Sequence, residues 1–295
     1  MNGKRQAPDV MQVELASLVH LLGGMAPKHL VAVGGLVPPL LVPEAPNPHR
    51  GSADIDLSLS MAITKGETSE YYRSLEATIE PYFEPFEAGF RWRKREGVGG
   101  VGLLVDFMGP EAEATQLADG TLQLESSLAA ENTGVVLRPY PLASAAIVEE
   151  DAQSVEIERV PLVYEEGVHA DVTIRHTGPV GFLASKADAF ETRSDNKDGY
   201  DVAWVCLHAR ETPEEVAAWI TDCPAFKNEY FQESVAKLRK AFREVTYPGP
   251  SGYAKEMNPG LAPGADAYER DRNAAYLRVS KVIEILRGSL WDEPA

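Results

Sequence analysis

The feature of this sequence that most constrains its fold is a change of character near residues 177–181. Before it, short apolar or alternating runs of strand length are separated by glycines and prolines, with helical stretches among them. After it, apolar residues recur at helical spacing to the end of the chain. We therefore expect an α/β (α+β) protein. Residues 1–178 should form a mixed sheet with helices, and residues 179–295 a mainly helical domain.

Two patterns in residues 1–178 predict strands. Short apolar runs stopped by glycine, such as "HLVAV", predict buried strands, and alternation of apolar and polar residues, as in "DIDLSLS", predicts half-buried ones. The strands are predicted at 29–33, 54–60, 89–96, 100–109, 135–141, 154–164 and 169–177. Residues 110–132 are polar and predict a loop or a short insertion.

Helices are predicted where apolar residues at helical spacing are framed by start and stop residues. Asp9 is placed to cap the first helix, and Gly23-Gly24 to end it. Thr212-Pro213-Glu214-Glu215 has the residues of a capping box with proline in the first turn. The proline-rich "LVPPLLVP" allows only a short, interrupted helix. The helices are predicted at 9–22, 69–83, 182–193, 196–210, from 212, at 232–245 and at 265–286, with a Pro/Gly-rich loop at 246–264.

The charge and cysteine content exclude several classes of protein. The formal net charge is −17, so general nucleic-acid binding is excluded, although a local basic patch could still hold RNA. Cys206 and Cys223 lack the spacing of a zinc site or a disulfide framework, and Cys206 lies in an apolar run that predicts burial. The N-terminus has no apolar signal-peptide core, and no apolar run approaches bilayer length. We expect a cytoplasmic protein without a membrane partner.

The chemistry of the chain centres on "RGSADIDL". Side chains at i and i+2 of a strand point to the same face, so Asp54 and Asp56 should project together. Two carboxylates held close repel each other unless a cation neutralises them or both face water. Oxygen ligands of this kind suit Mg²⁺, or Mn²⁺, together with the phosphates of a substrate.

Two further features could complete such a site. Asp106 interrupts the apolar run of a predicted strand, and an acid there is best accommodated if it points into a site. If its strand lies beside "DIDLSLS", three carboxylates converge as metal ligands. Gly34 and Gly35 follow a strand, where a tight backbone can approach phosphates and direct N–H groups toward them.

These elements together resemble the nucleotidyltransferase fold of the polymerase-beta type. The family pattern is Gly-Gly or Gly-Ser, then Arg-x-Ser/Thr-x-Asp-x-Asp, then a third acid on a later strand. Here these positions are Gly34-Gly35, the element from Arg50 through Ser52 and Asp54 to Asp56, and Asp106. The resemblance implies an NTP as substrate, with Gly34, Gly35, Arg50 and Ser52 as nucleotide contacts.

The helical half resembles a narrower family, the AbiEii-type nucleotidyltransferase toxins of type IV toxin–antitoxin and abortive-infection (phage-defence) systems. "KADAFETRSDNKDGYDVAW" is similar to their Lys-x-x-Ala-x-x-x-Arg…(Arg/Lys)-Asp-x-x-Asp motif, at Lys186, Arg193, Lys197, Asp198 and Asp201. The resemblance implies that Lys186 contacts nucleotide phosphates and that Asp201 is needed for activity. It covers about residues 30–209, and the last third of the chain matches no motif.

The sequence departs from these patterns in three places. Gly35 stands where serine is frequent, so one hydroxyl contact is missing. The segment between the glycines and the acid pair is rich in proline, and Arg193 is followed by the acidic "SDNKD". His49, beside the acid pair, is expected to be a loop histidine.

Structural interpretations stay open for the residues of the first half. Asp54 and Asp56 could form an acidic strand edge, and Asp106 could be a strand-end acid. Gly34-Gly35 could be a plain turn, and Arg50 could merely pair with a nearby acid.

In the second half, Lys186 could be a helix-surface lysine. Asp201 could pair with Arg193 or Lys197 across the helices, and Asp198 is better explained by a structural role. Two basic stretches, "RWRKR" and "KLRKAFR", could contact RNA or simply be solvated faces, and Trp92 is available for base stacking. The basic residues concerned are Arg91, Arg93, Arg95, Lys237, Lys240 and Arg243.

The sequence therefore predicts a metal-dependent nucleotidyltransferase that moves an NMP from an NTP to an acceptor and releases pyrophosphate. Asp54, Asp56 and Asp106 are the predicted metal ligands, and Asp106 is the candidate base for the acceptor hydroxyl. The resemblance implies RNA, particularly the tRNA 3′ end, as the acceptor, and a toxin with a cognate antitoxin. The alternatives are a non-toxin enzyme acting on a small molecule or protein, and an inactive binding module of the same fold.

Overall fold

The computed structural model describes residues 6–59, 67–87, 89–110, 115–116, 122–123, 136–192 and 197–291. The chain forms two compact units. The first consists of Met1–Val37 with Arg50–Thr177, and the second of Pro38–His49 with Gly178–Ala295. The segment Pro38–His49 thus belongs to the second unit, although it precedes most of the first in sequence.

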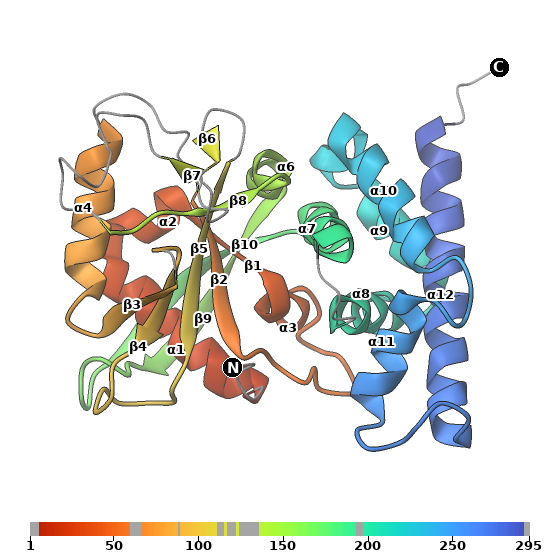
Figure 1. Cartoon of the computed structure of the whole chain (residues 1–295), viewed down its shortest axis with the longest axis horizontal. Helices are drawn as coiled ribbons and strands as arrows, with labels where there is room; N and C mark the ends of the chain where they lie inside the picture. Colours follow the sequence, from red (N-terminus) through yellow and green to blue (C-terminus); the bar gives the residue numbers. More distant parts are fainter. Residues whose placement is uncertain are drawn as a thin grey trace. The chain divides into compact units, whose positions relative to one another are not determined.

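The first unit is built on one mixed sheet (Figure 1). Its strand order is β3-β4-β5-β2-β1-β10-β9, and β8 pairs with β5. β2 runs parallel to β5 and antiparallel to β1, and β4 runs antiparallel to β5. The strands are β1 Leu30–Val33, β2 Asp54–Leu59, β3 Phe83–Glu87, β4 Arg91–Lys94, β5 Leu104–Pro110, β8 Tyr140–Leu142, β9 Ala152–Pro161 and β10 His169–Thr177, with a separate pair formed by β6 Thr115–Gln116 and β7 Leu122–Gln123.

Helices cover both faces of this sheet (Figure 1). α1 (Pro8–Leu22) packs against β9, β10 and α4 (Glu67–Ile79). On the other face, α6 (Ala145–Glu150) packs with Val31 and Val33 of β1. The short elements of this region are η1 Gly23–Met25, α2 Ala26–His29 and η2 Gly34–Leu36, and α3 (Val37–Leu41) follows, with all but its first residue in the second unit.

The second unit is helical, as expected. It contains α7 Pro179–Thr192, α8 Lys197–His208, α9 Pro213–Thr221, η3 Pro224–Lys227, α10 Glu229–Ala241, α11 Pro248–Met257 and α12 Asp266–Trp291. α8 packs closely on α11 because Gly199 has no side chain. A Cβ built at Gly199 would lie 2.4 Å from the backbone oxygen of Gly249. The mixed sheet with helices and the helical second unit confirm the expected fold class.

Several local predictions are confirmed. The Thr212 hydroxyl accepts from the Glu215 N–H, the Glu215 carboxylate accepts from the Thr212 N–H, and Pro213 begins α9. α1 ends at Leu22 before Gly23. The short proline-rich helix α3 lies where expected, and Cys206 is buried.

Other local predictions are wrong. Asp9 does not cap α1, which begins at Pro8 and has no side-chain cap. The predicted loop 246–264 contains α11, since its tyrosine and alanine residues bury one face against α8 and α12. β3 and α6 were not predicted, because both are short and depend on packing with neighbours.

The strand β2 is buried on both faces rather than half-buried. Ile55 and Leu57 are buried on the face opposite the acids, and Ser58 is buried on the acid face. The reason is its central place in the sheet, with β1 on one side and β5 on the other. Most of the predicted polar insertion at 110–132 lies outside the described residues.

Candidate active site

The acids of the first unit are brought together by the pairing of two neighbouring strands. Asp56 of β2 lies directly opposite Asp106 of β5, and Asp54 lies opposite Leu104. Cross-strand partners share a face of the sheet, and residues two apart along a strand do too. All three carboxylates therefore project from one face at the start of the two parallel strands.

One carboxylate oxygen of each acid lies within 4.8 Å of the others. Asp56 and Asp106 are 8% and 3% exposed, whereas Asp54 is only half-buried. The Ser52 hydroxyl donates to Asp54 Oδ1 at 2.9 Å and so fixes the orientation of that carboxylate. Of the three acids, Asp54 is thus the most accessible to solvent, and its carboxylate is held by Ser52.

Gly34 is required by this cluster. Its φ is +72°, and a Cβ built there would lie 1.9 Å from Asp56 Oδ2. Any side chain at this position would collide with the carboxylate and would also be strained in the left-handed region. Gly34 therefore leaves the space that the Asp56 carboxylate occupies. Gly35 follows in the same short turn, η2.

Arg91 of β4 contributes a positive charge that the sequence did not place here. It lies opposite Asp106 in the antiparallel pairing of β4 and β5. Its Nε and Nη2 donate to Asp106 Oδ1 and Oδ2 at 2.7 and 2.6 Å. Hydrogen bonding to Asp106 raises the pKa of Arg91, burial opposes that rise, and the charges of Asp106, Glu87 and Asp54 add to it.

The residues present fit a divalent cation. Three carboxylate oxygens within reach of one another form the donor set that Mg²⁺ or Mn²⁺ prefers. Three acids and one arginine leave a formal charge of −2, which a divalent ion would neutralise. Asp54, Asp56 and Asp106 are the residues that would hold it.

The structure shows where the other predicted nucleotide contacts of the first unit lie, but it does not test their role. Arg50 is exposed, and Ser52 is buried beside Asp54. Roles for Gly35, Arg50 and Ser52 in nucleotide binding remain predictions.

The two residues predicted from the helical motif lie in the second unit, in a different cluster. Lys186 of α7 is buried, and its Nζ donates to Asp198 Oδ1 at 2.8 Å and to Asp201 Oδ2 at 2.6 Å. Burial alone would lower the pKa of Lys186, but attraction by the two aspartates outweighs it and raises the pKa. Both aspartates of α8 are thereby joined to α7 across the helix pair.

His49 lies in a loop, as expected, but its side chain belongs to this buried cluster. Its Nε2 lies 3.1 Å from Asp201 Oδ1, and its side chain is fully buried. Its ring packs against Tyr200 and, edge-on, against Trp204. No local pattern indicates this placement, because it depends on the segment Pro38–His49 joining the second unit. Arg193 lies outside the described residues.

Each basic stretch contains residues that are paired with acids. Besides Arg91, both Arg93 and Arg95 of "RWRKR" contact Glu84. In the second stretch, Lys237 of α10 pairs with Asp188 at 3.1 Å. Trp92 is buried and its Nε1 donates to Gly89 O, so it offers no exposed ring for stacking in this conformation. Contact of either stretch with RNA remains a prediction.

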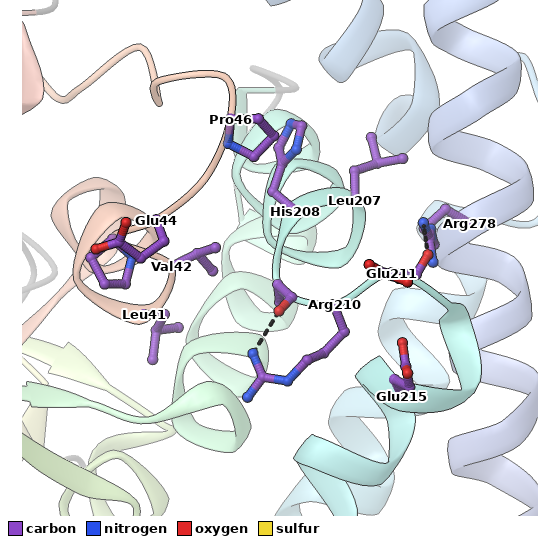
Figure 2. Close-up of a pocket in the computed structure, with 12 residues that line it drawn as sticks. Leu41, Val42, Glu44, Pro46, Leu207, His208, Arg210, Glu211, Glu215 and Arg278 are labelled. Atoms are coloured by element: carbon purple, nitrogen blue, oxygen red, sulfur yellow. Dashed lines mark hydrogen bonds between the residues drawn. The ribbon is translucent and has the colours of Figure 1, made fainter.

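A separate cavity of about 640 Å³ lies within the second unit (Figure 2). Arg210 donates to Ala209 O at 2.6 Å, and Arg278 donates to Glu211 O at 2.8 Å. Burial first, then the charges of Arg278 and His49, lower the pKa of His208 in its wall. No predicted site residue lines this cavity.

One helical stretch, Pro8–His29, is long and apolar enough to cross a membrane by length and composition. Half of its most apolar window is buried inside the fold. No unbroken apolar run approaches bilayer length, as expected. The mean hydropathy of this stretch nevertheless reaches the level of a membrane-spanning helix. A core helix meets the same measure, and α1 is packed against β9 and β10.

Comparisons with known proteins add little to the geometry. No protein-family model matches the chain, and no curated protein matches it. Among solved structures, the chain is similar to an antigenic nucleotidyltransferase-like protein from Paracoccidioides brasiliensis, with 14% identity and a TM-score of 0.43. The match covers 80% of this chain and 90% of that one. The assignment of a function therefore rests on the site itself.

Proposed function

We propose that this protein is a metal-dependent nucleotidyltransferase, which moves an NMP from an NTP to a hydroxyl acceptor and releases pyrophosphate. The observation that carries the proposal is the convergence of Asp54, Asp56 and Asp106 on one face of adjacent parallel strands. In an acidic strand edge without a ligand, the carboxylates would be expected to face water. Here two of them are nearly buried, and Gly34 lacks the side chain that would collide with Asp56.

The chain's own residues have the following parts in this proposal. Asp54, Asp56 and Asp106 would hold the cation, and Ser52 orients Asp54. When bound, the cation would bring the triphosphate to the cluster and offset its charge. The acceptor oxygen forms a bond to the α-phosphorus as the bond to the β-phosphate breaks. Asp106 is our candidate to receive the hydroxyl proton, and pyrophosphate carries away the electron pair.

The proposed acceptor is RNA, with the tRNA 3′ end as the first to test, and the proposed biological role is that of a toxin controlled by an antitoxin protein. The support is the motif resemblance in α7 and α8, around Lys186 and Asp201. The net charge of −17 keeps a small-molecule or protein acceptor as the alternative, because it disfavours approach of a polyanion.

The test is incubation of the purified chain with each α-labelled NTP, Mg²⁺ and total RNA. We expect label in RNA and an equal release of pyrophosphate with one or more of the NTPs. Label on protein or on a small molecule in cell extract would keep the enzyme class and replace the acceptor. Absence of label from RNA, protein and small molecules alike would remove the transferase assignment.

A second candidate is an inactive binding module, which the paired Arg91 favours because it occupies both oxygens of Asp106. The two candidates differ in metal binding. An enzyme should bind Mn²⁺, a spectroscopic substitute for Mg²⁺, at the three acids. A module that has lost its activity with Arg91 as permanent counter-charge should bind none.

A further inference from the structure

The guanidinium of Arg91 blocks the third ligand position of the acid cluster. Its two donor nitrogens match the two oxygens of Asp106 in a fork-to-fork pair, which is the strongest form of charged hydrogen bonding between side chains. A cation that used Asp106 as a ligand would have to compete with this pair. Asp54, by contrast, accepts a hydrogen bond from the Ser52 hydroxyl.

Arg91 also has a second acceptor already in contact. Its Nη1 donates to Glu87 Oε2 at 3.1 Å, on the exposed side of the sheet edge. The Arg91 side chain is 25% exposed and that of Glu87 49%, whereas that of Asp106 is only 4% exposed. The guanidinium can therefore leave Asp106 toward Glu87 and water without becoming an unpaired buried charge.

The formal charge of the cluster depends on whether Arg91 is paired with Asp106. With Arg91 in place, the formal charge of the three acids and the arginine is −2, which one divalent ion balances. Once Arg91 leaves, the three acids alone carry −3, and together with the phosphates of a nucleotide they can hold more positive charge. Because the fork engages both Asp106 oxygens, that carboxylate can be held either by Arg91 or by a cation.

We propose that Arg91 is an internal counter-cation that competes with divalent metal for Asp106, and that it passes to Glu87 when the metal site is completed. Arg91 is thus a positioning residue that acts through Asp106. The inference rests on the metal site of the proposed function and deepens it, because it states what the resting protein must release before that site is whole.

The test measures Mn²⁺ binding to the full chain without nucleotide, by calorimetry and by the electron paramagnetic resonance of free Mn²⁺. Arg91→Gln removes the competitor, and Arg91→Lys keeps the charge but not the fork. We expect both variants to bind Mn²⁺ more tightly than the unmodified chain, Arg91→Gln by about 10- to 100-fold, the range equivalent to one charged hydrogen-bonded pair.

The matched control is Arg93→Gln. Arg93 lies two residues along β4 on the same face and pairs with Glu84 instead of a cluster acid. It should change Mn²⁺ affinity by no more than about twofold, as expected for a screened surface charge. If Arg91→Gln behaves like Arg93→Gln, or if Arg91→Lys binds no more tightly than the unmodified chain, competition by the fork is wrong.

A second measurement follows the unmodified chain and uses Arg91→Lys only to assign one resonance. The Arg91 Nε–H resonance, identified by its absence in Arg91→Lys, should be protected from solvent exchange in the metal-free protein and lose that protection as Mg²⁺ is added. Unchanged protection at saturating Mg²⁺ overturns the inference and leaves the metal site standing. Failure of every variant and of the unmodified chain to bind Mn²⁺ overturns the proposed function itself.

Discussion

The protein contains two clusters built from the same materials, carboxylates and one long cationic side chain. In the first unit, three aspartates face one arginine, and Asp54 gives the cluster a route to solvent. In the second unit, Asp198 and Asp201 share Lys186 and are buried with it. The first cluster has a formal charge of −2 with Arg91, whereas the second has −1 with Lys186, and each of its aspartates is hydrogen-bonded to that lysine.

The difference shows why residue type alone does not identify a site. A buried cluster whose acids are each paired with the same lysine needs no further cation to be held, and removing that lysine leaves uncompensated buried charges, so the main effect is on stability. A cluster with excess negative charge at an accessible edge is stabilised by binding a cation. Removing one of its acids should therefore mainly affect metal binding and catalysis. The following predictions test this division, from the largest expected effect to the smallest.

Removing a carboxylate of the first cluster should abolish activity without unfolding the chain. Asp56→Ala should lower the rate of nucleotide transfer by about 10³- to 10⁴-fold, because a metal ligand supplies several kcal/mol of transition-state stabilisation. The measurement is label transfer at saturating NTP, with circular dichroism as the check of folding. Ser58→Ala, two residues along the same face of β2, is the control and should retain activity. Full activity in Asp56→Ala would remove the acid pair from the mechanism.

Removing the cation of the second cluster should instead lower stability. Lys186→Met should reduce the free energy of unfolding by about 3–5 kcal/mol, since it strands two buried aspartates. Urea unfolding measures this loss. Adding Asp198→Asn and Asp201→Asn to the variant should restore part of it.

The matched control is Lys281→Met on α12, whose partner Glu284 lies 3.2 Å away in a pair with side chains 46% and 70% exposed. It should cost about 1 kcal/mol or less, because the pair is screened by solvent. The opposite result for Lys186→Met, loss of transfer with an unchanged unfolding midpoint, would favour the phosphate contact implied by the motif resemblance.

A side chain at Gly34 should damage the first cluster more than its strain alone can explain. Gly34→Ala places a Cβ 1.9 Å from Asp56 Oδ2. We expect Mn²⁺ affinity to fall by about 10- to 100-fold, as for other changes that misorient a metal ligand. Gly97→Ala is the control, since Gly97 also has a positive φ, +83°, but nothing lies within 4 Å of its Cβ. Equal Mn²⁺ affinity in the two variants would show that Gly34 is a plain turn.

Acid should destabilise the second unit through His208. Burial, with the charges of Arg278 and His49, lowers its pKa in the folded state below the ordinary 6.5. The unfolded chain therefore binds more protons than the folded one below that pH, and the free energy of unfolding falls as the pH drops from 6.5 toward the folded-state pKa.

The slope can reach about 1.4 kcal/mol per pH unit for one histidine. Urea unfolding at pH 7.5 and 5.5 measures it, and His208→Gln should flatten the dependence. Substitution of the exposed His169 by glutamine is the control and should leave the slope unchanged. An equal slope in His208→Gln would assign the acid sensitivity to other groups.

Local patterns were sufficient where short-range physics decides the outcome. The capping box at Thr212 is closed by hydrogen bonds within one helical turn, and the alternation around Asp54 and Asp56 is a property of one strand. The same kind of reasoning missed α11, because its helical state depends on burial against α8 and α12 rather than on its proline- and glycine-rich composition.

The sequence by itself determined the ligand types, the common direction of Asp54 and Asp56, and the division into a strand-rich and a helical part. Only the tertiary structure decided the partners of those residues. It put Asp106 beside Asp56, Arg91 across from Asp106, and Lys186 between two aspartates. Strand register and helix packing join segments distant in the chain, and their energy comes from cores that form only when those segments meet.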